Sequence, residues 1–315
     1  MKLFIVDWTG LTKSRGGRLI KSKVSIIILN YNNFADTIEC LKNVRQIDYD
    51  NFEIIIVDNH STDHSIMELR KSIQSNEVLL PAQINYGYAA GNNIGIKYAL
   101  NQGTDYLCIL NNDVEVDKHF LTVMVDTLEK HTEIGIAGPK ICDYYDRNRI
   151  QSAGAMVNMN LGRATDLYKG QKISEVSQKI LSCDYVGGAC LVVRASAIDK
   201  AGLIPENYFL FYEENEWCAH FKQHGYQVAG LTEATVWHKG SHTIGKISGL
   251  SEYFMYRNLV IFIKRNGNLK NKIIFNLYFI AFCLKSLFTK KNGIRFFKYY
   301  CDGLTGKNSY QYLQK

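Results

Sequence analysis

One stretch of this chain places acidic and amide side chains directly after an apolar run. Residues 106–110 are all apolar or aromatic, and Asn111-Asn112-Asp113 follows at once. Such a run is typical of a strand buried on both faces, and open α/β sheets bind ligands at the carboxyl ends of their strands. A carboxylate there suits a hard divalent cation that carries a phosphate. The alternative is an ordinary turn, for which Asn-Asp is also good chemistry.

Three other apolar runs end in polar residues in the same way. They are residues 24–29, 52–57 and 78–80. The segments between the runs show helical spacing, and we expect helices around residues 38–44, 66–73 and 91–100. Alternation of strands and helices predicts a parallel sheet with right-handed crossovers. The polar residues after all four strands therefore meet at one edge of the sheet, where we expect the functional site.

Six short segments along the chain resemble the signatures of glycosyltransferase family 2, in the family's order. They are residues 25–32, 57–63 and 85–95, the Asp-x-Asp region at 110–116, the Glu-Asp motif at 208–218 and the late His motif at 237–241. The similarity extends from about Val24 to about Asn266 and is greatest to the rhamnosyltransferase-like branch. Each segment is short, and their common order makes the resemblance specific.

The resemblance implies a GT-A fold, which is an α/β architecture with a Rossmann-like, nucleotide-binding mixed sheet flanked by helices. We accordingly expect an N-terminal extension of unknown purpose (1–23), a catalytic domain (24–266) and a helical, basic C-terminal segment (267–315). The implied activity is inverting transfer of a sugar from a nucleoside diphosphate to a glycan or lipid-linked acceptor in cell-surface polysaccharide synthesis. The branch suggests dTDP-L-rhamnose as donor, and UDP-sugars are the main competitor.

The resemblance also assigns roles to individual residues. Asp113 would hold a Mg²⁺ or Mn²⁺ ion that bridges the diphosphate, and His238 would complete its coordination. Nucleotide and donor contacts would come from Asn30, Asp58, Asn85, Asn92, Asn93, Asn112 and Arg257. The loop Gly187-Gly188-Ala189, together with Glu213, would shape the sugar and acceptor site. For His238 the alternative is a packed, hydrogen-bonded residue.

Three glycines in the third signature have two interpretations. Gly87, Gly91 and Gly95 would let the backbone approach a ligand closely. The alternative is a glycine-containing turn and helix start without ligand contact.

Glu214 occupies the position of the family's catalytic Asp, and we expect it to be the general base. A sugar hydroxyl attacks best when a carboxylate within hydrogen-bond reach takes its proton. The chain departs from the family here, because Glu213-Glu214 replaces Glu-Asp. The longer side chain keeps the chemistry and moves the oxygen by about one methylene. The alternative for this acidic cluster is a helix N-terminus, where carboxylates favour the helix dipole.

Positive charge is concentrated at the C-terminus. Residues 264–315 hold 11 Lys and Arg against a single acidic residue, Asp302, and the rest of the chain holds 26 basic and 29 acidic residues. An apolar stretch of about 16 residues, 273–288, falls short of the roughly 20 that a spanning helix needs. It predicts a helix lying in the interface of an anionic membrane. The alternative is a helical pair packed on the catalytic domain; no motif supports nucleic-acid binding.

Composition fits one catalytic domain with an appendage. The chain has 315 residues, 46% of them apolar, and only 3 prolines. Its 8 cysteines are scattered and several lie in apolar runs, as free buried thiols do. In the absence of a secretory signal we expect a reduced cytoplasm and a peripheral position at the inner face of the cell membrane.

Two other functions were weighed against glycosyl transfer. A sugar nucleotidyltransferase should carry a Gly-rich, Arg- or Lys-containing phosphate loop after its first strand, where this chain has Asn30-Tyr31-Asn32-Asn33. A non-catalytic sugar-binding scaffold would have no need to keep Asp113, Glu214 and His238 together, and turnover of sugar nucleotides separates it from an enzyme. Donor sugar, acceptor, linkage and oligomeric state are not encoded in these short motifs.

Overall fold

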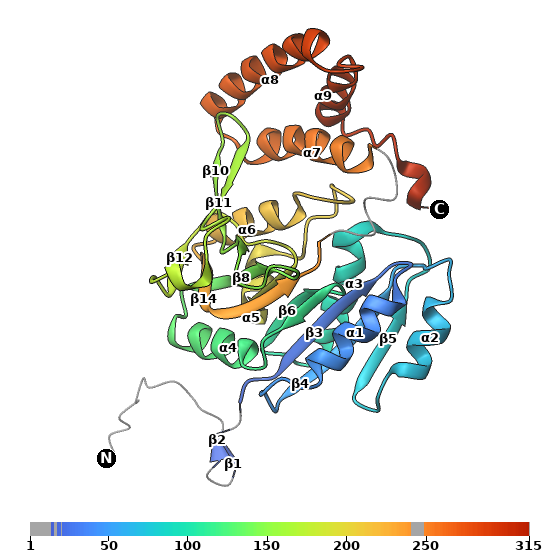
Figure 1. The fold of residues 1–315 in the computed structure, drawn as a ribbon, viewed down its shortest axis with the longest axis vertical. Helices are drawn as coiled ribbons and strands as arrows, with labels where there is room; N and C mark the ends of the chain where they lie inside the picture. Colours follow the sequence, from blue (N-terminus) through green and yellow to red (C-terminus); the bar gives the residue numbers. More distant parts are fainter. Residues whose placement is uncertain (1–13, 16–17, 20, 241–248, 315) are drawn as a thin grey trace, which may run out of the picture.

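The computed structural model describes residues 14–15, 18–19, 21–240 and 249–314. Most of the predicted N-terminal extension (1–23) and Ser241 of the late His motif lie outside these residues. The described chain forms an α/β body, and a layer of three helices, α7 to α9, covers one end of it (Figure 1).

The body is built on a mixed sheet with strand order β12-β14-β8-β13-β6-β3-β4-β5. Its parallel half consists of β3 (Val24–Asn30), β4 (Phe52–Asp58), β5 (Glu77–Pro81) and β6 (Tyr106–Asn111). These are the four strands that the apolar runs predict, and their parallel direction is confirmed. Along β3, Ile26 and Ile28 face one core cluster while Ile27 faces the other, so the strand is buried on both sides.

The resemblance implied a mixed sheet, but the individual strands of its other half were not predicted. Here β13 (Cys190–Arg194) runs antiparallel between β6 and β8 (Ile134–Asp143), and β14 (Gln227–His238) lies parallel to β8. Three short strands pair at its margins: β7 (Val114–Val116) with β14, β9 (Ile150–Ser152) with β8, and β12 (Ile180–Ser182) with β14. A separate hairpin joins β10 (Ala155–Asn158) to β11 (Arg163–Asp166).

Helices cover both faces of the sheet. One face packs against α1 (Phe34–Val44), α2 (Ser65–Ser72) and α4 (Phe120–Lys130). The opposite face packs against α3 (Gly87–Asn101), α5 (Ala195–Ala201) and α6 (Glu213–Gln223). The three predicted helices correspond to α1, α2 and α3, and α3 begins four residues earlier than predicted.

The glycines of α3 serve the packing of this helix on the sheet. A Cβ atom at Gly91 would lie 2.7 Å from a methyl of Leu29, and one at Gly95 would lie 2.6 Å from a methyl of Ile27. For these two positions the structure therefore favours the interpretation without a ligand. Gly87 differs, because it has a φ of +79° and lies where the backbone of α3 meets Phe209.

Three C-terminal helices form a separate aromatic layer. They are α7 (Leu250–Asn266), α8 (Leu269–Thr289) and α9 (Arg295–Thr305). Tyr256 of α7 contacts the rings of Phe279 and Phe282 from α8 and of Phe296 from α9. The layer thus begins at α7, ahead of the predicted boundary at 266/267, and the division of the chain into domains stays a prediction.

Helix α8 is longer than the apolar run at residues 273–288, from which it was predicted. Asn268 caps its N-terminus by accepting a hydrogen bond from the Asn271 N–H, so the helix starts four residues before the run and spans 21 residues. Within the described residues α8 is the one helix whose length and composition would allow it to cross a membrane.

All 8 cysteines are free. Seven are buried, as the sequence predicted, and Cys301 on α9 is exposed.

The close approach of α3 to β3 gives a first prediction. Replacing Gly by Ala inside a helix normally stabilises a protein by about 1 kcal/mol. We expect Gly95→Ala instead to lower the free energy of unfolding by about 1 to 3 kcal/mol, because its new methyl would overpack against Ile27. Urea titration measures the change. Lys97→Ala, on the exposed side of the same helix, is the control and should change stability little.

Candidate active site

The turn between β6 and β7 brings Asp113 beside His238. Strand β7 follows Asp113 directly and pairs antiparallel with the end of β14, with Val114 opposite His238. The Asp113 carbonyl accepts a hydrogen bond from the Lys239 N–H at 3.1 Å. As a result His238 Nε2 lies 3.3 Å from Asp113 Oδ1. The two predicted metal ligands, which are 125 positions apart in the chain, are neighbours.

This pair fits a divalent cation. His238 Nδ1 lies 3.3 Å from Gln151 Oε1, and a proton on Nδ1 would leave the Nε2 lone pair facing the Asp113 carboxylate. A cation between them would satisfy both groups. Residues 21–240 and 249–314 contain no cluster of three or more His, Cys, Asp or Glu side chains suited to a metal. A Mg²⁺ or Mn²⁺ ion between these two side chains would take its other ligands from phosphate and water.

Asp113 also lines an open cleft of about 1000 Å³ at the carboxyl end of the parallel strands. The cleft is lined by Leu29, Tyr31, Asn59, Asn85, Gly87, Tyr88, Asn111, Asn112, Asp113, Phe209, Leu210, Leu250 and Leu313. Of the predicted nucleotide contacts, Asn85 and Asn112 are among these residues. Asn112 also donates a hydrogen bond to Thr37 Oγ1 at 2.9 Å, which fixes its side chain against α1.

Asn30 and Asp58 are brought together, and they do not line this cleft. Both are fully buried, and Asn30 Nδ2 donates to Asp58 Oδ2 at 2.7 Å. Ser61 donates to the same carboxylate from its backbone N–H and its hydroxyl. Contact with a nucleotide would require an exchange of these hydrogen bonds.

Three other residues that were predicted to contact the sugar nucleotide form hydrogen bonds within the protein. Asn93 Nδ2 donates to the Ile204 carbonyl at 2.8 Å, and Asn92 Nδ2 donates to the Tyr88 carbonyl at 2.9 Å. The Arg257 guanidinium is buried and donates to the carbonyls of Gly306 and Lys307 at 2.9 Å each. These partners hold Arg257 in the helical layer, and the structure does not bring it to the cleft.

Glu214 stands beside the loop Gly187-Gly188-Ala189. A Cβ atom at Gly188 would lie 3.7 Å from the Glu214 carboxyl carbon. The Gly188 carbonyl accepts a hydrogen bond from the Tyr88 hydroxyl at 2.7 Å, and the Ala189 carbonyl accepts one from the Asn111 N–H at 2.9 Å. The loop thereby connects Glu214 with Tyr88 and with the end of β6, next to Asp113.

The pKa of Tyr88 also reflects the carboxylates around its hydroxyl. Burial, and then the negative charges of Glu214, Glu213 and Asp113 among others, raise the pKa of Tyr88 well above its ordinary value. Both acidic side chains that the sequence singles out therefore lie near one hydroxyl, which itself lines the cleft. The structure brings Asp113 and Glu214 to the same region.

The first turn of α6 contains three carboxylates with different environments. Burial raises the pKa of Glu214 to about 7. Burial and the neighbouring Glu214 raise the pKa of Glu213 well above its ordinary value, and Glu213 Oε2 has no hydrogen-bond partner in the described residues. For Glu216, burial would raise the pKa, but hydrogen bonds from His220, Tyr208 and Arg265 outweigh it and hold the pKa at about 2.

These differences separate the roles of the three groups. The Glu213 carboxyl is buried with one oxygen unpartnered, and its surroundings disfavour the charged form. Glu214 changes its protonation state near neutral pH, as a proton acceptor should. Glu216 is a structural anion that links α6 to α7 through Arg265 Nε at 2.7 Å.

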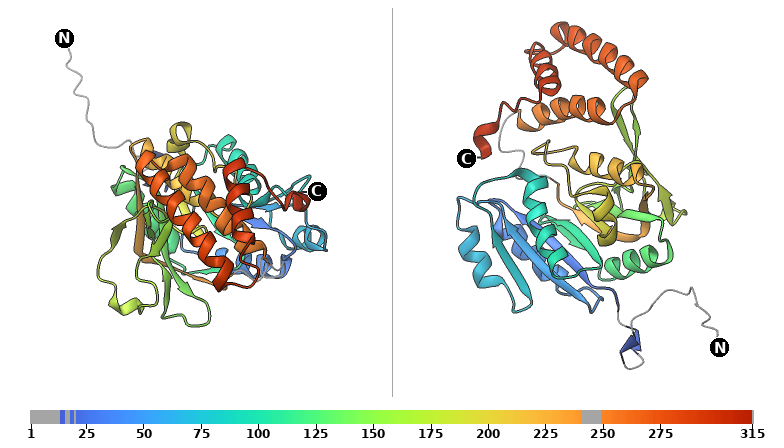
Figure 2. Two further views of the ribbon diagram at one scale, coloured as in Figure 1. Left: turned by 90° about the horizontal axis from the view of Figure 1, so that it is seen from above. Right: turned by 180° about the vertical axis from the view of Figure 1, so that it is seen from behind.

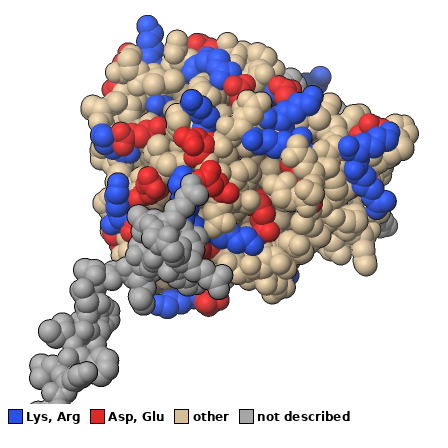
Figure 3. Space-filling model, turned by 90° about the horizontal axis from the view of Figure 1, so that it is seen from below, with Lys and Arg blue, Asp and Glu red and all other residues tan. Residues whose placement is uncertain are grey.

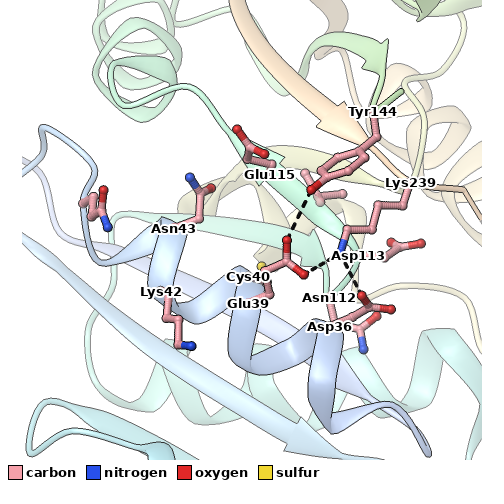
Figure 4. Close-up of a pocket in the computed structure, with 12 residues that line it drawn as sticks. Asp36, Glu39, Cys40, Lys42, Asn43, Asn112, Asp113, Glu115, Tyr144 and Lys239 are labelled. Carbon is pink, nitrogen blue, oxygen red and sulfur yellow. Dashed lines mark hydrogen bonds and ion pairs between the residues drawn. The ribbon is translucent and has the colours of Figure 1, made fainter. Parts of the chain in front are cut away.

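A second, open pocket is also lined by Asp113 (Figure 4). The Lys239 side chain crosses it and pairs with Asp36 at 2.8 Å and with Glu39 at 2.7 Å, both from α1. Asn112 and Asp113 line both cavities. Lys239 is thus held by the carboxylates of α1.

Sequence reasoning missed several residues of the cleft. Tyr31, Asn59 and Tyr88 lie inside the family-like segments, so their neighbours in the chain were a usable signal. Leu250 and Leu313 come from the helical layer and the C-terminal turn η3 (Gln311–Gln314), and no local pattern marks them.

Comparison with known proteins identifies relatives with named activities. Residues 25–200 match the family model described as Glycosyl transferase family 2. The low-salt glycan biosynthesis hexosyltransferase Agl10 of Haloferax volcanii is 26% identical over 201 residues, which are 62% of this chain and 60% of that protein. The dTDP-rhamnosyl transferase RfbF of Shigella flexneri is 21% identical over 309 residues, covering 91% of this chain and 97% of that protein.

A solved structure shares the fold. The mannosyltransferase PcManGT from Pyrobaculum calidifontis was solved in complex with GDP-Man and Mn²⁺. It superposes with a TM-score of 0.58 over 91% of this chain and 87% of that chain. The sequence identity is 14%, so the likeness concerns the fold. The expected GT-A architecture with a helical C-terminal region is confirmed.

The opposite pKa shifts of Glu214 and Glu216 give a paired prediction. Because the folded protein binds the Glu214 proton more tightly than the unfolded chain does, Glu214 costs stability as the pH rises from about 4.5 to about 7. We expect Glu214→Gln to raise the thermal midpoint by several degrees, on the order of 2 to 6 °C, above pH 7 and to change it little at pH 5. Scanning calorimetry across this range measures the effect.

Glu216→Gln is the matched control in the same helical turn. The depressed pKa of Glu216 contributes stability that is present above the unfolded value of 4.5 and is lost as the pH falls towards about 2. This variant should therefore lower the midpoint above pH 7. Equal losses in both variants would show that the two carboxylates do not differ as described.

Proposed function

The chain belongs to glycosyl transferase family 2, and we propose that it is an inverting, metal-dependent hexosyltransferase. It moves a sugar from a nucleoside diphosphate to a hydroxyl of a glycan or lipid-linked acceptor. The observation that carries this proposal is the meeting of Asp113 and Glu214 around Tyr88, because one carboxylate is suited to a cation and the other to a proton.

In the proposed reaction the acceptor oxygen attacks the anomeric carbon of the donor sugar. Glu214 takes the proton of that hydroxyl as the new C–O bond forms, and the bond between the sugar and the diphosphate breaks on the opposite face. Attack from the opposite face inverts the anomeric configuration. Asp113 and His238 would hold a Mg²⁺ or Mn²⁺ ion, which would supply positive charge to stabilise the departing diphosphate.

The neighbours of Glu214 support this role. Glu213 is buried beside it, and that burial disfavours a second negative charge next to Glu214. A Cβ atom at Gly188 would lie 3.4 Å from the Tyr88 hydroxyl and 3.7 Å from the Glu214 carboxyl carbon, so Gly188 lies directly beside both groups. The Tyr88 hydroxyl donates a hydrogen bond to the Gly188 carbonyl.

Asn85 and Asn112 are the best-placed nucleotide or sugar contacts, since both line the cleft with Asp113. Asn30 and Asp58 keep a proposed role at the base or ribose, provided that Ser61 exchanges its hydrogen bonds. The donor is dTDP-L-rhamnose or a UDP-sugar. The first choice is supported by a relative named dTDP-rhamnosyl transferase, which this chain matches along nearly its whole length.

A transferase that serves lipid-linked or surface glycans works close to a membrane. We therefore propose a peripheral position at the inner face of the cell membrane, in the cytoplasm, as the basic C-terminal segment predicts.

Metal-dependent donor binding gives a third prediction. A nucleotide that binds the folded state raises the thermal midpoint by mass action, and the preferred donor raises it most. Among dTDP-rhamnose, UDP-glucose, UDP-GlcNAc and GDP-mannose, we expect the true donor to produce the largest shift, and only with Mn²⁺ or Mg²⁺ present. Asp113→Asn should reduce this shift at least about tenfold in apparent affinity, because the amide cannot neutralise the cation.

Asp126→Asn, on the exposed side of α4, is the control and should bind the donor with metal like the wild type. A metal-dependent shift that survives Asp113→Asn unchanged would remove Asp113 from the metal site.

The pH dependence of transfer gives a fourth prediction. A base must be unprotonated, and burial raises the pKa of Glu214 to about 7. We expect kcat/KM to fall below about pH 7 and to level off above it, whereas an ordinary carboxylate would keep activity down to about pH 4.5. Glu214→Gln should bind the donor normally and lose transfer by about 100-fold or more. An active Glu214→Gln enzyme, or an acidic limb near pH 4.5, would contradict the assignment.

A further inference from the structure

Helix α8 carries a continuous apolar stripe on the side that faces solvent. The large hydrophobic side chains of this stripe are 39% (Ile280) to 89% (Phe288) exposed. The members of this stripe, which we call the α8 stripe, are Leu269, Ile273, Leu277, Ile280, Leu284, Leu287 and Phe288. Successive members are mostly three or four residues apart, which places them along one face of the helix from end to end.

The opposite face of α8 is part of the aromatic layer. Phe275, Phe279 and Cys283 are buried there, and Phe279 contacts rings of Tyr256 and Tyr300 from the two neighbouring helices. If α8 crossed a bilayer by itself, these buried contacts with α7 and α9 would be lost. The geometry therefore suits a helix that lies along a surface, with one face on its own protein and the other free.

Basic side chains border the α8 stripe. Lys270 and Lys285 are exposed, and each follows a leucine of the stripe by one residue, which puts it at the edge of the apolar face. Exposed Lys291 and Lys298 continue this positive charge beyond the end of the helix. Between residues 269 and 315 the only acidic residue is Asp302, which is buried and bonded to Tyr253 and Ser309.

The position of α8 leaves the stripe accessible. The helix lies outermost at the end of the molecule, beyond α7 (Figure 1), and the view from above shows it uncovered across that end (Figure 2). At the opposite end of the molecule, Lys and Arg side chains are interspersed with Asp and Glu (Figure 3). The excess of positive charge and the exposed apolar stripe thus occur together at one end.

We propose that the α8 stripe docks this protein on an anionic lipid bilayer, with α8 parallel to the membrane plane. Its leucine, isoleucine and phenylalanine side chains enter the acyl boundary, and the bordering lysines contact lipid phosphates. The charge pattern selects lipid over a second copy of the chain. Two copies packed stripe to stripe would bring their lysines together, with no exposed carboxylate between residues 269 and 315 to offset them.

Co-sedimentation of the full chain with vesicles tests this proposal without any sugar donor, so its outcome is independent of the proposed catalysis. We expect binding to phosphatidylcholine vesicles that contain phosphatidylglycerol to exceed binding to phosphatidylcholine alone by about tenfold or more, and to weaken as salt is added. Leu277→Glu/Phe288→Glu should reduce binding to the anionic vesicles by about tenfold or more, because both side chains lie in the stripe.

Two control variants separate the contributions. Met67→Glu changes an exposed hydrophobic residue on α2 of the α/β body and should bind vesicles like the wild type. Lys270→Gln/Lys285→Gln should lose most of the preference for anionic lipid while its thermal midpoint stays unchanged.

Three results would overturn the proposal. The first is a full chain that does not bind anionic vesicles. The second is a folded Leu277→Glu/Phe288→Glu variant, with an unchanged circular dichroism spectrum, that binds as well as the wild type. The third is a wild-type dimer in light scattering that this double variant converts to a monomer, because the stripe would then be an interface between copies.

Discussion

The register between β7 and β14 decides which two side chains meet at the end of the central strand. Because Val114 lies opposite His238, the imidazole is placed beside Asp113 in the turn that precedes β7. A slip of one residue would send His238 to the other face of the sheet and bring a neighbour of different chemistry to its place. The hydrogen bond from Lys239 to the Asp113 carbonyl and the pairing of Lys239 with α1 hold this register from both sides. The proposed cation site is therefore a consequence of strand pairing.

The proposed base is positioned by packing of a different kind. Helix α6 begins at Glu213, and its first turn is buried against Tyr88 and the loop around Gly188. Within four residues, the same turn contains two carboxyls whose pKa is raised and one whose pKa is lowered. Burial raises the pKa of Glu213 and Glu214, and the hydrogen bonds of Tyr208 and Arg265 help to lower the pKa of Glu216. The Glu-Glu sequence, a departure from the family pattern, thus places one carboxyl in the core and leaves the next beside the loop at Gly188.

The sequence predicted those parts of the fold that depend on local patterns. The parallel strands were predicted because each is a short run of mostly apolar residues, and the motif residues after them share an edge for reasons of topology alone. Strand β13 and the pairing of β7 with β14 depend on contacts between distant segments, which no local pattern encodes. Arg257 shows the same limit for side chains: it was predicted to contact the nucleotide, but its hydrogen-bond partners are backbone carbonyls some 50 residues away. The stripe on α8 was visible as composition, and only the packing of Phe275 and Phe279 shows which face is free.

The exposure of a single thiol has a practical consequence. Seven cysteines are enclosed by the fold, and Cys301 alone is open to solvent, on the helix packed beside α8. A maleimide dye added to the native protein should therefore attach at one position without any engineered mutation. The dye would report from the outer helical layer, so the natural sequence already carries a specific handle for fluorescence spectroscopy.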